Sequence, residues 1–402
     1  MAVALSLETS MPRATPKVTA PASEWSVELV EDRSALVKHQ AAWDVLAQSA
    51  IEPNVFFEPW MFLPAAQFFE PNTPLCCVFV YRRAPLLGAP PILCGFFPFE
   101  RRRRYRGLPI RSLRLWEPRY VLFTPLVHRI WARETLHVLL DWIVSKEGCP
   151  LVEMPMIHGE GPWHQALVDV LNERRMLSFV DEIYTRALIR RGPDAESYCA
   201  AALDKERLRN WRRQRRRLSE QGKFETRVLQ PDDDPERWIE QFLRLEASGW
   251  KGQEKTALGM IESSEAIFRA SARNGFALGK LQMLGLFLDE KPIALKCNYL
   301  TGAGGFTFKI AYDENYARYS PGVLLELDNI EQMHRRPGLE WLDSCAVPDH
   351  AMMNRIWKER RTIQSVTLAT SRWIGNSVVG LMPLLRALRA ILSNKKSCLI
   401  VS

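Results

Sequence analysis

Three consecutive residues, Ser320-Pro321-Gly322, have the composition of a helix start that could bind an anion. Serine is a favoured N-cap residue, and proline suits the first helical position. Glycine in the next position is unexpected, because it costs about 1 kcal/mol relative to alanine within a helix. Its missing side chain would leave the first-turn N–H groups accessible, where the helix dipole also favours negative charge. The stretch predicts a phosphate site; the alternative is a packing partner that crowds this position.

Acidic residues and a histidine follow the strands next to this helix and could move protons. Asp343 lies in an otherwise apolar strand, where a carboxylate is costly unless it is paired or functional. His350 could act as a base or protonate a leaving group. Asp313 follows the preceding strand. We predict Asp343, His350 and Asp313 as catalytic candidates, and the competing interpretations are an ion pair, a helix start and a turn.

Two dense basic clusters, residues 101–106 and 205–217, carry much of the net charge of +8. Such clusters suit phosphate-bearing or acidic partners without choosing among them. The second cluster could be a cationic wall for an anionic acceptor, with Arg212 and Arg216 in contact, or a solvated helix face. Nucleic acid is not expected, because single-stranded RNA sites interleave exposed aromatics with charge, and only Trp211 is available here.

The elements that position these residues repeat in the two halves of the chain. Alternating apolar residues and turn signals predict three antiparallel strands, a helix, a returning strand, a short helix and a last strand in each half. One element order found twice indicates a duplicated domain, with the join near Gly192-Pro193. The first half has these elements at 74–82, 90–99, 111–123, 124–144, 150–157, 161–173 and 176–189, and the second at 281–289, 293–300, 306–312, 320–335, 339–346, 348–360 and 361–369.

The helix starts of the two halves differ at one position. Thr124-Pro125-Leu126 in the first half corresponds to Ser320-Pro321-Gly322 in the second, and both offer an N-cap hydroxyl followed by proline. Only the second half replaces the next side chain by hydrogen. We therefore expect a phosphate site in the second half and a blocked one in the first.

Composition fits a globular protein of two domains. The chain has 402 residues, of which 47% are apolar and 25% charged. Its eight cysteines form no Cys-x-x-Cys pair, which favours reduced thiols and a cytoplasmic location. The seven histidines show no metal-ligand spacing, so we predict no metal.

The two ends of the chain fall outside the repeat. Residues 1–23 are small, polar and proline-containing, which predicts a disordered tail without a secretory signal. Residues 373–392 are apolar, but Pro383, Arg386 and Arg389 interrupt them, which argues against a membrane span. We predict an amphipathic helix packed on the protein; the alternative is a helix that contacts a membrane surface.

The second half resembles the GNAT acyltransferases. Its local sequence resembles their CelD-like branch, which comprises acetyltransferases associated with cellulose and exopolysaccharide synthesis. The same tandem architecture occurs in Fem-type aminoacyltransferases. The resemblance implies an α/β (α+β) fold of tandem GNAT-like domains, each a mixed, mainly antiparallel sheet flanked by helices. The stretches that carry it are "GFTFKIAYDENYARYSPGVLLELDNI", "LEWLDSCAVPDHAMMNRIWKERR", "LRNWRRQRRRLSEQG", "FLRLEASGWKGQEKTAL" and, nearer the start, "PNVFFEPWMF".

By this resemblance, the tail at 1–23 precedes a degenerate N-terminal domain at 24–192. A C-terminal domain at 193–372 would hold the acyl-CoA site, and 373–402 would form the terminal helix and tail. The pantetheine arm of acetyl-CoA, or of another acyl-CoA, would pair with the backbone along 306–311, and the pyrophosphate would meet the helix start. The implied cofactor-binding residues are Lys309, Ile310, Ala311, Arg318, Tyr319, Ser320, Pro321, Gly322 and Val323.

The predicted reaction is acyl transfer from acyl-CoA to an amine or hydroxyl in polysaccharide or cell-envelope biosynthesis. The acceptor would be a small molecule or saccharide, which could be anionic, and Trp250 and Lys251 would join the two arginines in binding it. The chain departs from the family because no tyrosine follows Tyr319, where the usual catalytic acid lies. The alternatives are a Fem-type aminoacyltransferase and a non-catalytic module that binds a polyanion.

Overall fold

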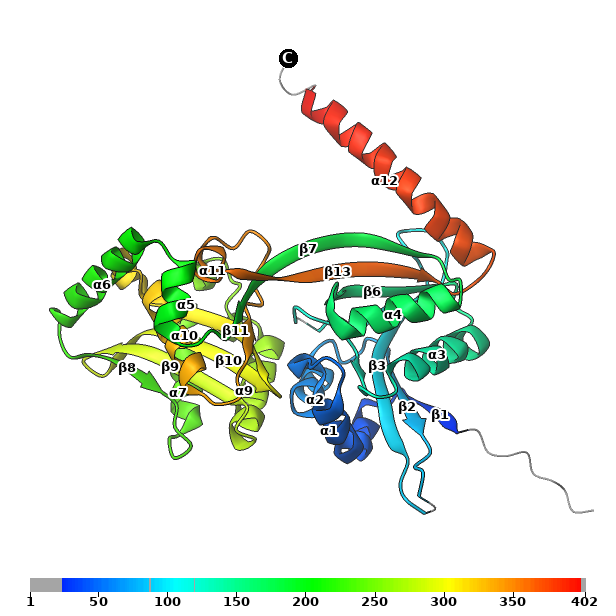
Figure 1. The fold of residues 1–402 in the computed structure, drawn as a ribbon, viewed down its shortest axis with the longest axis horizontal. Helices are drawn as coiled ribbons and strands as arrows, with labels where there is room; N and C mark the ends of the chain where they lie inside the picture. Colours follow the sequence, from blue (N-terminus) through cyan, green and yellow to red (C-terminus); the bar gives the residue numbers. More distant parts are fainter. Residues whose placement is uncertain (1–23, 87, 119, 399–402) are drawn as a thin grey trace, which may run out of the picture.

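A computed structural model describes residues 24–86, 88–118 and 120–398, except for the side chains of residues 250, 251 and 388–398. The tail expected over residues 1–23 lies outside the described residues. Within them, the chain forms a mixed α/β structure in which one large sheet is flanked by helices on both faces (Figure 1). This is the predicted fold class.

The sheet is continuous through both halves of the chain. Its strands follow the order β1-β2-β3-β4-β6-β13-β7-β12-β11-β10-β9-β8, and β5 pairs with β3 outside this path. Only β4–β6 and β11–β12 pair in parallel; the other pairings described are antiparallel. The strands are β1 (Trp25–Val30), β2 (Leu75–Arg82), β3 (Ile92–Arg102), β4 (Ser112–Leu115), β5 (Leu126–Val127), β6 (Leu151–His158), β7 (Ser178–Arg190), β8 (Phe224–Val228), β9 (Leu281–Leu288), β10 (Lys291–Thr301), β11 (Gly304–Tyr312), β12 (Trp341–Asp343) and β13 (Glu359–Ala369).

The helices cover both faces of this sheet, and the strand sequences show why. Along β9, Met283 and Phe287 pack in the same apolar cluster as residues of α7 and α9, whereas Leu284 and Leu286 pack with α10. A strand buried on both faces has a nearly continuous apolar sequence, which in β9 is interrupted by Gln282. The α-helices are α1 (Gln40–Ser49), α2 (Pro59–Phe68), α3 (Ala132–Trp142), α4 (Gly161–Glu173), α5 (Ala195–Ala202), α6 (Lys205–Ser219), α7 (Pro235–Ser248), α8 (Trp250–Gln253), α9 (Glu262–Ala277), α10 (Pro321–Arg335), α11 (Ala351–Ile356) and α12 (Ile374–Cys398). Shorter helical segments are η1 (Arg33–His39), η2 (Val55–Phe57), η3 (Ile143–Glu147), η4 (Leu258–Met260) and η5 (Glu314–Tyr319).

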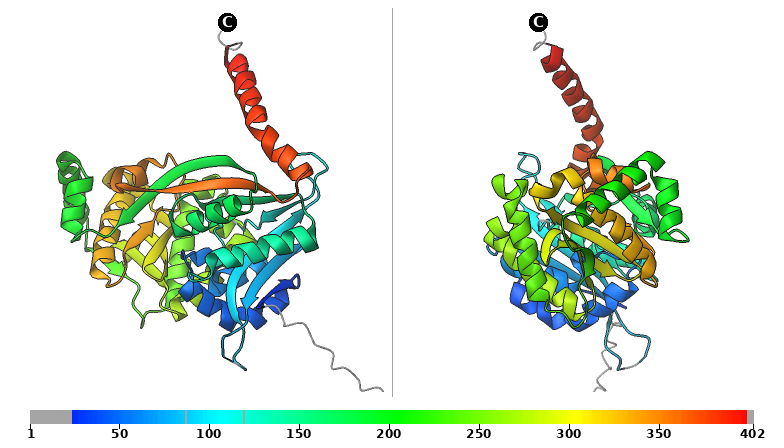
Figure 2. Two further views of the ribbon diagram at one scale, coloured as in Figure 1. Left: turned by 45° about the vertical axis from the view of Figure 1, so that its right-hand side comes forward. Right: turned by 90° about the vertical axis from the view of Figure 1, so that its left-hand side faces the viewer.

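The repeated element order is confirmed, but the halves exchange their last strands. The first half has β2, β3, β4, α3, β6, α4 and β7 in this order, with the two-residue strand β5 between β4 and α3. The second half has β9, β10, β11, α10, β12, α11 and β13. However, β7 pairs with β12 of the second half, and β13 pairs with β6 of the first half. The two exchanged strands also pair with each other from Glu359–Leu188 to Leu368–Ser178. They form the long double arch that spans the molecule in Figures 1 and 2.

The prediction that a helix starts at Thr124 is wrong. Residues 126–127 form β5 instead, and α3 begins only at Ala132. Thr124 is buried, and its Oγ1 accepts a hydrogen bond from the backbone N–H of His158 at 2.9 Å. The hydroxyl therefore holds this segment beside β6 and is not an N-cap. The strands predicted at 111–123 and 339–346 are likewise shorter, as β4 and β12.

The contacts described between the C-terminal helix and the rest of the protein lie in its first half. Val379 and Met382 are buried against Tyr105, Leu151 and Ala369. Beyond this contact α12 projects away from the body (Figures 1 and 2). Among the described residues, no helix is both long enough and apolar enough to cross a membrane.

Candidate active site

The sheet opens between β11 and β12 in the second half. These parallel strands pair only over three positions, from Gly304–Trp341 to Phe306–Asp343. Beyond Phe306, β11 continues to Tyr312 without a described neighbour on this side. In the same region the pairing with β10 shifts by one residue, so that Phe308 has no partner. Such a bulge re-aims backbone groups. The opening therefore exposes main-chain groups of β11 at the centre of the molecule.

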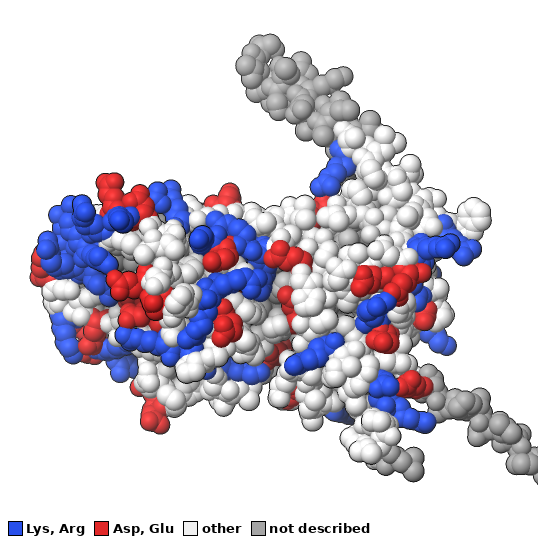
Figure 3. Space-filling view, in the orientation of Figure 1, with Lys and Arg blue, Asp and Glu red and all other residues white. Residues whose placement is uncertain are grey.

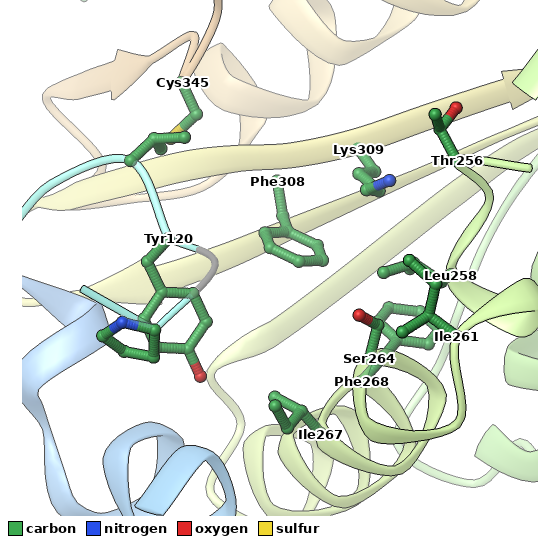
Figure 4. Close-up of a pocket in the computed structure, with 12 residues that line it drawn as sticks. Tyr120, Thr256, Leu258, Ile261, Ser264, Ile267, Phe268, Phe308, Lys309 and Cys345 are labelled. Carbon is green, nitrogen blue, oxygen red and sulfur yellow. The ribbon is translucent and has the colours of Figure 1, made fainter. Parts of the chain in front are cut away.

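A cavity of about 350 Å³ lies at this opening, between the two halves (Figure 4). Phe308 and Lys309 reach it from β11, Cys345 from the end of β12, and Tyr120 from a loop of the first half. The lining is mainly apolar and aromatic, as in most small-molecule sites. The remaining lining residues are Pro118, Val121, Thr256, Leu258, Ile261, Ser264, Ile267 and Phe268.

An ion pair joins the cavity wall to helix α7. Lys309 Nζ lies 2.8 Å from Glu246 Oε1, and the Glu246 side chain is fully buried. Oε2 of Glu246 accepts a hydrogen bond from the N–H of Leu258 at 2.8 Å. A buried carboxylate is costly unless it is paired. Glu246 thus holds Lys309 at the cavity and also fixes the segment that follows α8.

Two further lining residues are weak acids that stay protonated at neutral pH. Burial raises the pKa of Tyr120, whose hydroxyl donates a hydrogen bond to the carbonyl of Met61 at 3.0 Å. Burial and the nearby Asp343 raise the pKa of Cys345. Both groups therefore keep their protons at neutral pH, and neither is suited to act as a base there.

Asp343, a predicted catalytic residue, lies in the interior as a structural anion. Its carboxylate is fully buried and contacts Arg186 and Arg361, the latter at 2.9 Å. It also accepts a hydrogen bond from the N–H of Cys345 at 2.9 Å. Burial alone would raise the pKa of Asp343, but Arg186 and Arg361 outweigh burial and hold the pKa at about 2. Such a weak base is unsuited to proton abstraction, so the ion-pair alternative fits Asp343 best.

The helix start at Ser320 differs from the predicted N-cap. Pro321 is the first residue of α10, as predicted, but Ser320 has a left-handed backbone (φ 53°) and its hydroxyl makes no capping bond. The N–H of Val323 donates to the carbonyl of Ser320 at 3.0 Å, and the N–H of Ser320 donates to Ala317 at 2.9 Å. Gly322, at the second position, has no intrahelical acceptor within reach of its N–H, as at any helix start.

Crowding does not explain Gly322. A Cβ placed there would meet Tyr312, Met352 and Ile310 at 3.6–3.8 Å, which is ordinary van der Waals contact. The alternative of a packing partner that forbids a side chain therefore finds no support among the described residues. Gly322 is buried beside these three side chains, and its missing side chain leaves the N–H groups of the first turn uncovered at this position.

Cationic side chains lie beside this helix start. Arg217 from α6 and Arg318 from η5 line an open pocket of about 290 Å³, together with Gln214, Glu220, Gln221 and Tyr319. Helix α6 is held there because Arg215 forms an ion pair with Asp328 of α10. The predicted acceptor residues Arg212 and Arg216 are exposed on the same helix. No residue of α6 lines the cavity at β11. Basic side chains gather at the end of the molecule where α6 lies (Figures 1 and 3).

Of the remaining predicted residues, two cap helical segments, two have side chains outside the described part, and two lie on β11. Asp313 caps η5, accepting from the N–H of Asn315 at 3.1 Å, and contacts Lys291 Nζ at 2.7 Å. Burial opposes the shift, but these contacts lower the pKa of Asp313. His350 caps α11 by accepting from the N–H of Met353 at 3.3 Å. The side chains of Trp250 and Lys251 lie outside the described part. Ile310 and Ala311 lie on β11, as predicted.

The equivalent opening in the first half is filled by the chain itself. Strands β4 and β6 pair in parallel from Ser112–Leu151 to Arg114–Glu153 and then separate. Past that point the N–H of Phe123 donates to the carbonyl of Met156 at 3.0 Å. Residues 123–124 thus occupy the edge of β6 that corresponds to the opening beside β12. The same loop carries Tyr120 into the cavity of the second half.

Comparisons with known proteins agree with this topology. Residues 205–351 match the family model described as an acetyltransferase (GNAT) domain. FemX has the same fold at 9% identity, with a TM-score of 0.53 over 85% of this chain and 98% of FemX. A protein of unknown function from Bacteroides thetaiotaomicron VPI-5482 has a TM-score of 0.52 at 10% identity, covering 85% of this chain and all of that protein. No curated protein sequence matches significantly.

The opening beside β11 lies within residues 205–351, the part of the chain that matches the acetyltransferase (GNAT) domain model. Of the predicted residues, Lys309 lies in the lining of the cavity. Glu246, Tyr120, Cys345 and Ser264 were not among the predicted site residues. Only Glu246 left a local signal, because it lies four residues after Phe242 and seven after Ile239, on the apolar face of α7.

Proposed function

We propose that the protein transfers an acyl group from acyl-CoA, with acetyl-CoA as the simplest donor, to an amine or hydroxyl acceptor in polysaccharide or cell-envelope biosynthesis. The single observation that carries the donor assignment is the helix start at Gly322, a first-turn position without a side chain, which lies beside Tyr312 at the end of the strand that borders the cavity. We also propose the cytoplasm as its location, because acyl-CoA is found there.

The donor would lie along the free side of β11. Its diphosphate fits the first turn of α10, where Gly322 adds no side chain and Arg318 and Arg217 lie nearby. Main-chain groups of β11 beyond Phe306 would bind the pantetheine amides. The thioester would then lie at the bulge around Phe308, where a backbone N–H could stabilise the oxyanion that develops during acyl transfer.

We assign proton transfer to residues at the cavity. The acceptor must lose a proton as its nitrogen or oxygen bonds to the acyl carbon, and the carbon–sulfur bond of the donor then breaks. Lys309 lines the cavity and Glu246 lies buried behind it, so we assign Glu246 as a base that acts through Lys309: Glu246 takes a proton from Lys309, whose amine then takes the proton of the acceptor. The leaving thiolate needs a proton, and Lys309, which has taken up the proton of the acceptor, lies in the lining and can return it to the sulfur.

The cavity also constrains the acceptor. The rings of Tyr120, Phe268 and Phe308 would pack on an apolar face, such as that of a sugar ring, whereas Lys309 is the cation in the lining. A highly charged polyanion would find little to bind there. The aromatic lining therefore supports a small or saccharide acceptor over the polyanion-binding module.

Thermal unfolding in the presence of acyl-CoA tests this proposal. Wild-type protein at about 100 times the dissociation constant of acetyl-CoA should be stabilised by roughly 2.7 kcal/mol. Gly322→Val, which fills the space beside the first turn, should lose the shift, and Gly322→Ala should weaken it. Gly380→Val is the matched control, because Gly380 lies in α12 with nothing within 4 Å of an added Cβ.

Each outcome separates the alternatives. A ligand shift that Gly380→Val retains and Gly322→Val loses would support the assigned donor site. No shift with acetyl-CoA or longer acyl-CoAs would overturn the proposal and leave the Fem-type reaction, whose donor would be an aminoacyl-tRNA. A shift that Gly322→Val retains would mean that the donor binds elsewhere.

A further inference from the structure

The first turns of α12 are anchored to the end of the exchanged strands. Val379 and Met382 are buried there, and the hydroxyl of Tyr105 lies 3.8 Å from the sulfur of Met382. The guanidinium of Arg386 donates hydrogen bonds to the carbonyls of Val180 and Asp181 at 3.2 and 3.1 Å. The direction of the helix away from the body is therefore set by specific contacts (Figure 2).

The other side of the same segment carries large apolar side chains in contact with water. Leu381, Leu384 and Leu385 are 54%, 57% and 52% exposed, with the spacing of one helix face. At the base of the helix, Trp373 is 86% and Ile374 is 53% exposed. Single exposed apolar residues are normal on a protein surface, but a contiguous group indicates a binding surface. We call these five residues the α12 apolar surface.

Positive charge surrounds the α12 apolar surface. Arg103 and Arg104 are exposed in the loop whose Tyr105 packs on Met382, and neither has an ion pair among the described residues. Basic side chains lie at the foot of the helix in Figure 3. From residue 371 onward the sequence has no Asp or Glu, and its basic residues are Arg372, Arg386, Arg389, Lys395 and Lys396.

We propose that the α12 apolar surface and the loop at Arg103-Arg104 dock this protein on an anionic lipid bilayer. Leucine and tryptophan on one face with flanking arginine and lysine is the composition of a helix that lies in the membrane interface. Tryptophan favours this interface, and anionic lipids attract juxtaposed basic residues. A second copy of the chain fits less well, because pairing two such helices would bring like charges together without an acidic partner. This inference does not depend on the acyl-CoA site.

Vesicle flotation with the full-length protein tests the docking. Wild type should float with vesicles of phosphatidylcholine mixed with phosphatidylglycerol and bind pure phosphatidylcholine vesicles at least about tenfold more weakly. The double variant Leu384→Asp, Leu385→Asp should bind the anionic vesicles about tenfold or more weakly than wild type, because its apolar contact with the acyl region is lost. Arg103→Glu, Arg104→Glu should bind weakly at low salt, with the difference from wild type narrowing as salt is added.

Two controls test whether binding depends on the α12 apolar surface or on any exposed apolar or basic residue. Ile130→Asp changes an equally exposed apolar residue outside it, and Arg209→Glu, Arg213→Glu removes charge from α6 at the opposite end of the molecule. Both should float like wild type. All these side chains are exposed, so unchanged melting temperatures would show that the variants fold.

The proposal is overturned if wild type fails to float with the anionic vesicles, or if the α6 variant loses binding while the leucine variant keeps it. It is also overturned if sedimentation velocity shows a wild-type dimer that the leucine variant dissociates and flotation is absent. In that case a second copy covers the helix.

Discussion

Arg186 and Asp343 form a two-point ion pair in the interior, although 157 positions separate them in the chain. Arg186 Nε lies 2.7 Å from Oδ1, and Nη2 donates to Oδ2 at 2.8 Å. Arg186 also donates to the carbonyl of Val121 at 2.6 Å. The pair thus joins the last strand of the first half to the returning strand of the second, and it holds the loop that places Tyr120 in the cavity.

Replacement of Asp343 by asparagine should destabilise the fold. Asparagine leaves Arg186 and Arg361 buried without their counter-charge, and breaking a buried ion pair in this way costs about 3–5 kcal/mol. Urea unfolding of Asp343→Asn measures this loss. Asp141→Asn is the control, because Asp141 is 68% exposed beside Arg174, and its loss should change stability by less than about 0.5 kcal/mol. Equal stability of Asp343→Asn and wild type would show that the arginines find other partners.

Replacement of Glu246 by glutamine should lower acyl transfer without loss of donor binding. Glutamine can still accept the hydrogen bond from the N–H of Leu258, so the local backbone should persist, but it cannot take up a proton. The turnover number should fall about 100-fold or more, as for loss of a general base. Glu240→Gln on the exposed side of the same helix is the control. If Glu246→Gln abolishes the acyl-CoA melting shift as well, Glu246 holds the site together and does not serve as its base.

The sequence pattern reveals strands and helices but not which strands pair across the molecule. Apolar alternation predicted β7 and β13, yet each lies beside a strand of the other half, because periodicity reports burial and not the partner. For the same reason Tyr120 could not be placed: its loop is held at the cavity by contacts with residues distant in the sequence, such as Arg186 with Val121 and Tyr120 with Met61. Asp343 was correctly noted as an unusual buried carboxylate, but its two arginines come from exchanged strands.

The Ser-Pro-Gly stretch shows what local sequence can establish. Proline and glycine fixed the start of α10, because their backbone preferences are local. The role of the serine could not be derived, since the left-handed turn at Ser320 depends on η5 packing before it. At Thr124 the same local argument failed, because a buried contact with β6 outweighed the preference of its hydroxyl for an N-cap.

Glu52 should make stability depend on pH near neutrality. Burial raises the pKa of Glu52 to about 7, from an ordinary value of 4.5, and Arg361 opposes this only in part. Because the folded-state pKa is the higher one, the folded protein binds the proton more tightly, and stability falls as pH rises from 4.5 to 7. The fall should be at most about 3 kcal/mol.

The neutral variant Glu52→Gln isolates this contribution from that of neighbouring groups such as His158, 3.9 Å away. The unfolding free energy of Glu52→Gln minus that of wild type should grow between pH 4.5 and pH 7.5. The exposed Glu254→Gln should show no such trend. A difference that stays constant with pH would show that Glu52 ionises normally in the folded protein.

The exchange of β7 and β13 predicts that neither half folds well without the other. A fragment of residues 193–372 contains β12 and β13 but lacks β7, which lies between them, so both strands would present unpaired edges. It should be insoluble or unfold without a cooperative transition. Co-expression with residues 24–192 should restore a complex that co-purifies, because β7 is then available. Circular dichroism of each fragment and of the complex measures this, with the uncut chain as control. A cooperative transition of the 193–372 fragment alone, at the melting temperature of the whole chain, would show that β13 can pair with β12 directly and that the exchange is not needed for folding.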